Sequence, residues 1–279
     1  MNLRILYQDD QLVAVDKPAG FHVHPPEDAS IRISPNTNSL LLLKRQLGKY
    51  LYPVHRLDRA TSGVLVFALN PDAANGLARL FRDREIRKTY FCVVRGWVPE
   101  NGVIDHPLKV NPGLKTQVLE GRDGVSTPPL SPPGTYLALK GEVSLGSVKN
   151  SLERAAARTS FDRIAQLELP ISVGKYSTAR YSLVRVEPHT GRMHQIRRHF
   201  AHISHPLIGD TVYGAGEHNR IYRDQFSILG LLLKAYSLEF NHPIENIPLK
   251  ISSRWNGTWH KVFDLFGVCP RESRESGLG

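Results

Sequence analysis

Hydrophobic residues follow two spacings along this chain, one typical of strands and one typical of helices. Short apolar runs bounded by turn residues predict strands near residues 3–18 (a hairpin), 64–69, 89–98, 161–170, 180–187 and 228–240. Apolar residues at helical spacing predict helices over residues 40–47, 70–84 and 193–203. These elements are interspersed without a regular βαβ rhythm, so the pattern predicts an α+β fold with a mixed or antiparallel sheet.

The helix expected over 193–203 has two different faces. Met193, Ile196, Phe200 and Ile203 fall on its apolar side, and its polar face would carry His194, Arg197 and Arg198.

Residues 111–158 differ in character from the rest of the chain. They include a proline-dense run from Ser126 to Gly134, which resists both helix and sheet. We interpret 111–158 as a surface insertion within a single domain spanning 1–270, and 271–279 as a frayed polar tail.

Composition adds a preference for a polyanionic partner. The 279 residues include 36 Lys and Arg against 26 Asp and Glu, a formal net charge of +10. Such a surplus favours nucleic acid, because bound cations release the counterions condensed on phosphates. The two cysteines are far apart, and the chain shows no signal peptide and no apolar run of the ~20 residues needed to span a bilayer. These features predict a cytoplasmic protein with no membrane association.

Two arginine-rich blocks, residues 79–95 and 180–198, form the candidate nucleic-acid footprint. Aromatic residues lie among them and could stack on unpaired bases. The alternative is that these blocks are solvated charged faces over a core of aromatic side chains.

Asp58 is the candidate catalytic carboxylate. It lies in a polar loop just before a buried strand, between Arg56 and Arg59, and nearby positive charge keeps a carboxylate ionised. From local chemistry alone, a surface aspartate in a solvated ion pair is the more common explanation of the same pattern.

Other chemistries find little support. The histidines between His194 and His205 lack the spacing of a metal site, and no metal is expected. No serine-hydrolase elbow, Walker motif or dinucleotide motif is present, so no cofactor is expected either.

Several motifs, in a fixed order, resemble those of the RluA-type pseudouridine synthases. They comprise Leu12 to Gly20, His24-Pro25, His55-Arg56-Leu57-Asp58-Arg59 with Thr61-Ser62-Gly63, Arg87-Lys88-Thr89-Tyr90, Gly191 to Arg197, and His205 to Asp210. The resemblance covers the chain from end to end apart from the proline-rich insertion.

This resemblance implies roles for individual residues. Asp58 would attack the ribose C1′ or otherwise assist departure of the uracil, Tyr90 would stack on the target base and could remove its C5 proton, and Arg197 would pair with Asp58. Arg56 would fill the gap left by the flipped nucleotide. The other expected RNA contacts are Arg59, Arg87, Lys88, Arg192, His194, Gln195 and Arg198.

The resemblance also implies a fold and a substrate. The family domain is α+β, with a long bent mixed sheet flanked by helices and a central cleft, and it needs no cofactor. The family's N-terminal S4-type RNA-binding module is expected to be missing, because the first strand begins near residue 3. Residues 175–181 and 197–202 resemble the branch that acts on uridine 65 of tRNA. Ribosomal RNA, or a catalytically silent RNA-binding protein, remain alternatives, and the protein is expected to be a monomer.

Overall fold

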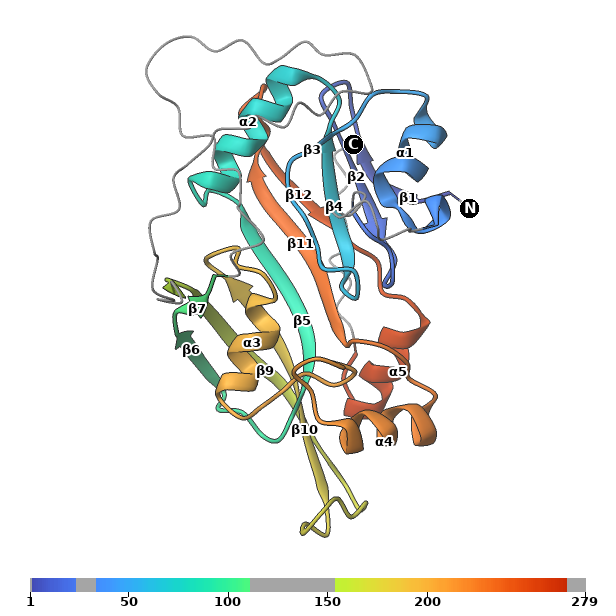
Figure 1. Cartoon of the computed structure of the whole chain (residues 1–279), viewed down its shortest axis with the longest axis vertical. Helices are drawn as coiled ribbons and strands as arrows, with labels where there is room; N and C mark the ends of the chain where they lie inside the picture. The colour runs from blue at the N-terminus through green and yellow to red at the C-terminus, as the bar shows by residue number, and fades with distance from the viewer. Residues whose placement is uncertain (1, 24–33, 111–153, 270–279) are drawn as a thin grey trace, which may run out of the picture.

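One ten-stranded mixed sheet organises the computed structural model, which describes residues 2–23, 34–110 and 154–269 (Figure 1). Its main path runs β1-β2-β4-β11-β5-β10-β9-β6, with β3 beside β4 and β12 beside β11. These strands are β1 (Arg4–Gln8), β2 (Leu12–Lys17), β3 (Tyr52–Pro53), β4 (Ser62–Ala68), β5 (Arg87–Arg95), β6 (Asn101–Asp105), β9 (Arg158–Leu169), β10 (Ala179–Pro188), β11 (Leu233–Asn241) and β12 (Pro248–Ser252). A separate two-stranded ribbon pairs β7 (Leu108–Lys109) with β8 (Arg154–Ala155).

Helices cover both faces of this sheet. They are η1 (Pro35–Thr37), α1 (Ser39–Leu47), α2 (Pro71–Arg82), α3 (Gln195–His202), α4 (Gly216–Phe226) and α5 (Gly257–Phe266). On one face, α1 packs on alternate residues of β2 and β4, and α3 packs on β5 and β10. On the other, α2 covers the first half of the sheet, and α4 and α5 cover the second. Strand alternation explains this division, because successive side chains of β2 and β4 enter opposite cores.

The two clusters that include α1 and α3 meet at one side chain. Tyr90 of β5 contacts both of them, whereas the neighbouring residues of β5 face the opposite side of the sheet. The junction between the two halves of the sheet therefore lies beside Tyr90, on the face that carries α1 and α3.

Most predicted elements are confirmed. The N-terminal hairpin, the long buried strand β4 and the helices α1, α2 and α3 all form close to their expected positions. Helix α2 begins as its sequence predicts, since the Asn70 side chain accepts a hydrogen bond from the Ala73 N–H at 2.9 Å and Pro71 occupies the first turn. The strand expected over 228–240 begins only at Leu233. The α+β class and the mixed sheet are confirmed.

The proline-rich segment needs one correction. Residues 111–153, the C-terminal stretch 270–279, and His24 and Pro25 lie outside the described residues. The last residues assigned to the insertion are regular structure, because Arg154 and Ala155 form β8 and Arg158 begins β9. The insertion therefore ends earlier than its composition suggests.

Gly63 should be the most sensitive backbone position in the sheet. It has φ +121°, and a Cβ there would lie 2.0 Å from the Ala235 carbonyl oxygen, where β4 and β11 run parallel. A Gly63→Ala variant is expected to lose about 3 kcal/mol or more of unfolding free energy, because both the conformation and the strand spacing must change. Chemical denaturation measures this loss. Gly216→Ala is the matched control, since a Cβ at Gly216 meets nothing within 4 Å, and equal stability of the two variants would contradict the prediction.

Candidate active site

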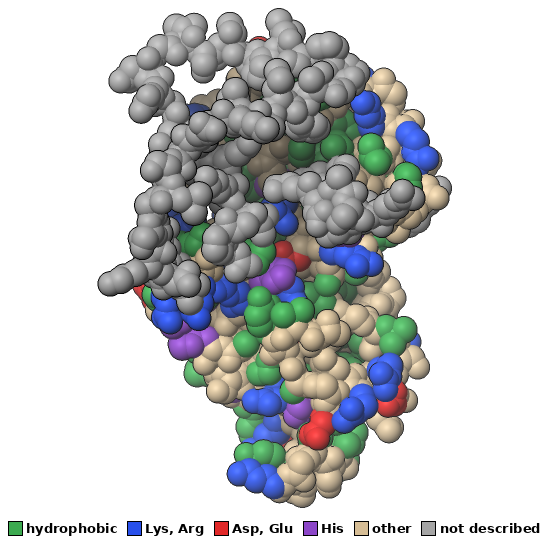
Figure 2. Space-filling model, viewed as in Figure 1, with side chains coloured by type: hydrophobic (Ala, Val, Ile, Leu, Met, Phe, Trp, Pro, Cys, Tyr) green, Lys and Arg blue, Asp and Glu red, His purple; other side chains and the backbone are tan. Residues whose placement is uncertain are grey.

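Asp58 lies in the loop between β3 and β4, at the junction between the two halves of the sheet. Its carboxylate retains 20% of its side-chain exposure, and its Oδ2 lies 3.6 Å from Arg197 Nη1 and 3.8 Å from His194 Nε2. The loop residue Leu57 is buried in the cluster that contains α1, and Ala60 packs against the cluster that contains α3. Apolar contacts on both sides thus hold the loop while its acid reaches the surface. Figure 2 shows acidic, cationic and histidine side chains together near mid-height of this face.

The cations near Asp58 differ from those expected. Neither of its sequence neighbours, Arg56 and Arg59, forms an ion pair with it among the described residues. Arg59 turns away and donates from Nε to the Gly20 carbonyl at 3.1 Å. The positive charge comes instead from Arg197, more than a hundred residues along the chain.

Lys17 connects the N-terminal hairpin to the β3–β4 loop that carries Asp58. It is fully buried, and its Nζ donates to the carbonyl oxygens of Pro18 at 3.0 Å, Phe21 at 2.9 Å and Arg59 at 3.2 Å. Burial lowers the pKa of Lys17 to about 7, and the charge of Asp58 opposes that shift. Three carbonyl acceptors match the three N–H bonds of an ammonium group, so Lys17 fixes the backbone beside Asp58.

Arg197 bridges two carboxylates. Its Nε and Nη2 donate to the two oxygens of Asp210 at 2.7 and 2.8 Å, while Nη1 faces Asp58. Burial works against the charge on Arg197, but Asp210 and Asp58 together raise its pKa. The side chain is only 6% exposed, so the expectation that it lies on a polar helix face is wrong. Two hydrogen bonds to a single carboxylate fix the orientation of a guanidinium group, and Asp210 is that carboxylate for Arg197.

Asp210 is the site residue that the sequence motif contained without a role being assigned to it. It is fully buried, and it also accepts hydrogen bonds from the N–H groups of Val212 at 2.8 Å and Tyr213 at 3.0 Å. Burial raises the pKa of this carboxyl, but the hydrogen bonds from Arg197 and from the two backbone groups outweigh that and lower it. Asp210 thus stays ionised beneath Arg197.

His194 is the second side chain close to the Asp58 carboxylate, and it also contacts Tyr213. Its Nδ1 lies 3.2 Å from the Tyr213 hydroxyl, and the Arg197 guanidinium sits 5.2 Å from the centre of the same tyrosine ring. Burial lowers the pKa of His194, and Asp58 only partly offsets this, so the imidazole is neutral at neutral pH. His194 has φ +53°, a conformation uncommon outside glycine that often marks functional sites. No motif or spacing in the sequence predicts that Tyr213 belongs to the site.

Tyr90 lies partly buried beside this group. Burial, followed by the charge of Asp58, raises the pKa of its phenol. Tyr90 is therefore a neutral hydrogen-bond donor with an aromatic face at neutral pH.

His55 lies at the start of the β3–β4 loop and is held by two contacts. Its Nε2 accepts a hydrogen bond from the Val66 N–H at 2.9 Å, and its ring stacks on that of Phe81 with 4.6 Å between the ring centres. Burial, with a smaller contribution from Lys88, lowers the pKa of His55 to about 3. The imidazole is therefore neutral in the folded protein, as an acceptor must be.

This neutral histidine predicts a loss of stability in acid. The unfolded chain binds a proton at His55 near pH 6.5 and the folded chain only near pH 3, so stability falls as pH falls through that window. At pH 4.5 the cost is roughly 2–3 kcal/mol. His55→Gln keeps an acceptor and removes the titration, so its unfolding free energy should fall less between pH 7 and 4.5 than that of the wild type. His260→Gln, at an exposed position, is the control, and identical pH dependence in all three proteins would contradict this account.

Some of the side chains predicted to contact RNA are accessible, and others are bonded to groups within the protein. Arg56, Arg59 and Arg192 are exposed, and Arg198 is partly exposed. Arg87 forms a two-bond ion pair with Glu187, at 2.6 and 3.1 Å. Lys88 is half-buried, with a pKa that burial lowers to about 8, and donates to the Thr190 carbonyl at 3.4 Å.

Gln195, which was expected to contact RNA, is buried and forms its hydrogen bonds within the protein. It is 5% exposed, its oxygen accepts from the Thr190 hydroxyl and the Arg192 N–H, and its amide nitrogen donates to Arg158 and Thr159. With its hydrogen-bonding capacity used internally, it fixes the start of α3.

No metal site is formed among the residues that the structure describes. His199, one of the histidines between His194 and His205, has Nδ1 at 2.9 Å from the Thr159 hydroxyl and Nε2 at 3.0 Å from the His106 carbonyl. Within the same ranges, no helix is both long enough and apolar enough to cross a bilayer.

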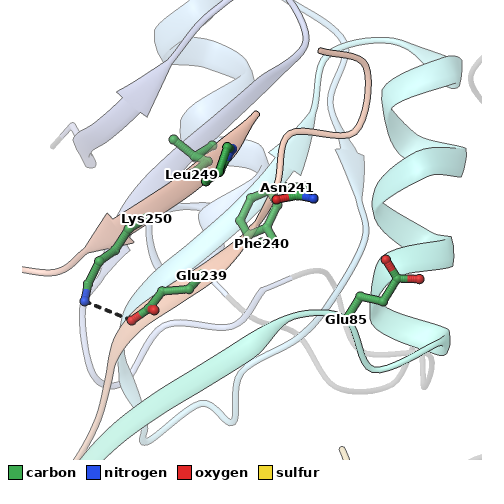
Figure 3. Close-up of a pocket in the computed structure, with 7 residues that line it drawn as sticks. Glu85, Glu239, Phe240, Asn241, Leu249 and Lys250 are labelled. Atoms are coloured by element: carbon green, nitrogen blue, oxygen red, sulfur yellow. Dashed lines mark ion pairs between the residues drawn. The ribbon is translucent and has the colours of Figure 1, made fainter. Parts of the chain in front are cut away.

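A shallow hollow between the α2–β5 turn and strands β11 and β12 lies apart from this site (Figure 3). It holds an ion pair between Glu239 and Lys250 at 2.9 Å. Its lining contains none of the predicted site residues and consists of Glu85, Glu239, Phe240, Asn241, Pro248, Leu249 and Lys250.

Comparison with known proteins decides the family. A model of the family described as RNA pseudouridylate synthase matches residues 11–202. The chain belongs to the RNA pseudouridylate synthase family. It is therefore an isomerase, in agreement with the motif that contains Asp58.

Two curated members of the RNA pseudouridylate synthase family cover nearly the whole chain. A protein named tRNA pseudouridine synthase C from Vibrio cholerae serotype O1 is 40% identical over 95% of this chain and 96% of its own length. A protein of the same name from Vibrio parahaemolyticus is 37% identical, over 95% and 96%.

A solved structure supports the fold. The human RNA Pseudouridylate Synthase Domain Containing 4 aligns with a TM-score of 0.62 and 24% identity, over 94% of this chain and 92% of the other. The predicted fold of the RNA pseudouridylate synthase family is confirmed.

Proposed function

We propose that this protein isomerises uridine to pseudouridine in tRNA, with Asp58 as the catalytic carboxylate. The observation that carries the proposal is the 40% identity, over nearly both full lengths, to a protein named tRNA pseudouridine synthase C. The net charge of +10 agrees with an RNA substrate. The target proposed here is uridine 65, because residues 175–181 and 197–202 resemble the branch that acts there.

The reaction exchanges one glycosidic bond for another. The C1′–N1 bond breaks and a C1′–C5 bond forms, while C5 loses a proton and N1 gains one. Atoms and electrons balance without an oxidant or a group donor. Asp58 attacks C1′ or stabilises the positive charge that develops there as uracil departs.

Arg197 and Asp210 act through Asp58. The guanidinium sits 3.6 Å from the Asp58 carboxylate and is held by Asp210 on its other edge, so it orients the acid. His194 is neutral at neutral pH and lies 3.8 Å from the same Asp58 oxygen. It can therefore donate a hydrogen bond to a substrate group without adding a second positive charge beside Asp58.

Tyr90 is suited to stacking against the target base. Its raised pKa keeps the phenol protonated, which makes it a poor base for the C5 proton. We therefore favour stacking and hydrogen-bond donation by Tyr90, while another group removes the proton. Arg56, exposed beside Asp58 in the sequence, would fill the space of the flipped nucleotide.

Mapping the modified nucleotide tests the choice of substrate. Purified protein would be incubated with unmodified tRNA and, separately, with unmodified ribosomal RNA, and pseudouridine located by chemical adduct formation and primer extension. The expected result is one new site in tRNA, at uridine 65. New pseudouridine in ribosomal RNA alone would overturn the tRNA assignment while leaving the chemistry intact.

The proposal places the protein in the cytoplasm, where tRNA is modified, and acting as a monomer. Light scattering on the purified protein should give a mass close to the 31.3 kDa of one chain.

A further inference from the structure

A cluster of cations lies on the outer side of α3, away from Asp58. We call it the β7–α3 patch and define it as Lys109 of β7, Arg154 of β8, and Arg198, with the histidines His106 and His202. Lys109 and Arg154 are cross-strand partners in the β7–β8 ribbon, and Arg198 Nη1 donates to the Lys109 carbonyl at 3.1 Å. Figure 2 shows cationic and histidine side chains gathered at the left edge of this face, at the level of β7 and α3 in Figure 1.

The cations of the patch have no acidic partners among the described residues, in contrast to Arg180 and Arg185. Arg180 pairs with Glu168 at 3.0 Å and Arg185 with Asp162 at 2.9 Å, across β9 and β10. Among the described residues, Lys109, Arg154 and Arg198 form no such ion pair. Their charge is therefore available to an external anion.

Two stacked imidazoles extend the patch. The rings of His106 and His202 lie 3.6 Å apart at 16°, in an almost parallel stack. Burial, then His202, Arg154 and Arg198, lower the pKa of His106, so this imidazole is neutral at neutral pH without a bound anion. The charged and titratable groups that face the pair are Arg154 from β8 and Arg198 and His199 from α3.

Helix α3 connects the patch to the active site. His194 and Arg197 face Asp58, whereas Arg198 and His202, four residues apart, share another side of the same helix. A helix is about 10 Å across, which one RNA strand spans in about three nucleotides. A strand with its target uridine at Asp58 can therefore reach the patch.

We propose that the β7–α3 patch binds the phosphate backbone of the RNA substrate, about three nucleotides from the target uridine. The proposal rests on the RNA-modifying function argued above. Lys109 and Arg154 contact phosphate directly, and Arg198 is held in place by its bond to the ribbon. A phosphate between the arginines offsets their repulsion of His106, so RNA binding favours protonation of His106.

A paired-variant experiment tests the phosphate contacts. Lys109→Ala/Arg154→Ala is expected to raise the Kd for unmodified tRNA about tenfold at 0.1 M salt and to reduce the slope of log K against log salt by about 2. The control is Arg4→Ala/Lys49→Ala, which removes two exposed cations near β1 and α1, across the molecule from the patch. Equal Kd values and salt slopes for the two double variants, with thermal melts that confirm both are folded, would overturn the proposal.

His106 has its own test. Wild-type affinity for tRNA should increase as pH falls from 7.5 to 5.5, and His106→Gln should lose part of that increase, because His106 takes up a proton on binding. Unchanged pH dependence in the variant would exclude His106 from the contact.

These outcomes are distinct from failure of the proposed function. If the wild type forms no pseudouridine yet the Lys109/Arg154 variant binds RNA more weakly than the control, the patch is an RNA contact and the assigned reaction is wrong. If the wild type modifies tRNA and the patch variant matches the control, only the patch assignment fails.

Discussion

An Asp58→Asn variant is expected to fold and bind tRNA normally and to form no detectable pseudouridine, a loss of about 10⁴-fold or more in rate. Asparagine keeps the shape of the side chain and removes the negative charge that, in the proposed mechanism, attacks or stabilises C1′. Arg197 retains its two bonds to the buried Asp210, so the surroundings should keep their geometry. The measurement is single-turnover pseudouridine formation, with tRNA affinity determined in parallel.

Asp264→Asn is the matched control, because it makes the same chemical change at an exposed position on α5. It should leave both rate and affinity within about twofold of the wild type. Turnover by Asp58→Asn near the wild-type rate would remove Asp58 from the mechanism.

Arg197→Met should destabilise the protein and inactivate it. The substitution leaves Asp210 fully buried without its cation, which costs about 3–5 kcal/mol for a broken buried pair. It also removes the cation 3.6 Å from Asp58, so the acid loses the group that orients it. Denaturant unfolding measures the first effect and single-turnover kinetics the second.

A second substitution separates these two effects. In Arg197→Met/Asp210→Asn the buried charge is gone, while the asparagine oxygen can still accept the N–H groups of Val212 and Tyr213. We expect most of the stability to return, because a neutral buried amide with partners costs far less than an unpaired carboxylate. Activity should stay low. Recovery of activity together with stability would mean that Arg197 serves only the fold.

The fold was predictable wherever one local rule dominates. The apolar run of β4 and the Asn70-Pro71 start of α2 gave elements close to those observed. Helices α4 and α5 were not predicted, although an Asn256 cap at α5 accepts the Trp259 N–H at 3.1 Å. The ribbon β7–β8 pairs residues on either side of a long insertion, and no local pattern specifies such a pairing.

The site was predictable in its motif residues and not in their partners. Asp58, Tyr90 and Arg197 come together as the resemblance implied, with a direct ion pair between Asp58 and Arg197. Arg56 and Arg59 were expected to hold Asp58 ionised, because sequence adjacency was the only information on charge. The actual environment of Asp58 depends on Asp210 and Tyr213, whose places are set by the fold.

Charge counted along the sequence also overestimated the RNA footprint. The block 180–198 contains a single acid, yet Arg180 and Arg185 are paired with acids of the adjacent strand β9. In a sheet, the residue that neutralises a side chain is usually cross-strand, and a window on one strand cannot include it. By contrast, Lys109, Arg154 and Arg198 of the β7–α3 patch form no ion pair among the described residues, and they come from three segments of the chain.

Release of hydrogen from C5 tests the central claim most directly. Forming the C1′–C5 bond expels the C5 hydrogen to solvent, so tRNA labelled with tritium at uridine C5 reports each isomerisation. Wild-type protein at saturating concentration should release tritium from one uridine per tRNA molecule, in step with the appearance of pseudouridine. No release from tRNA or ribosomal RNA by the folded wild-type protein would contradict the account.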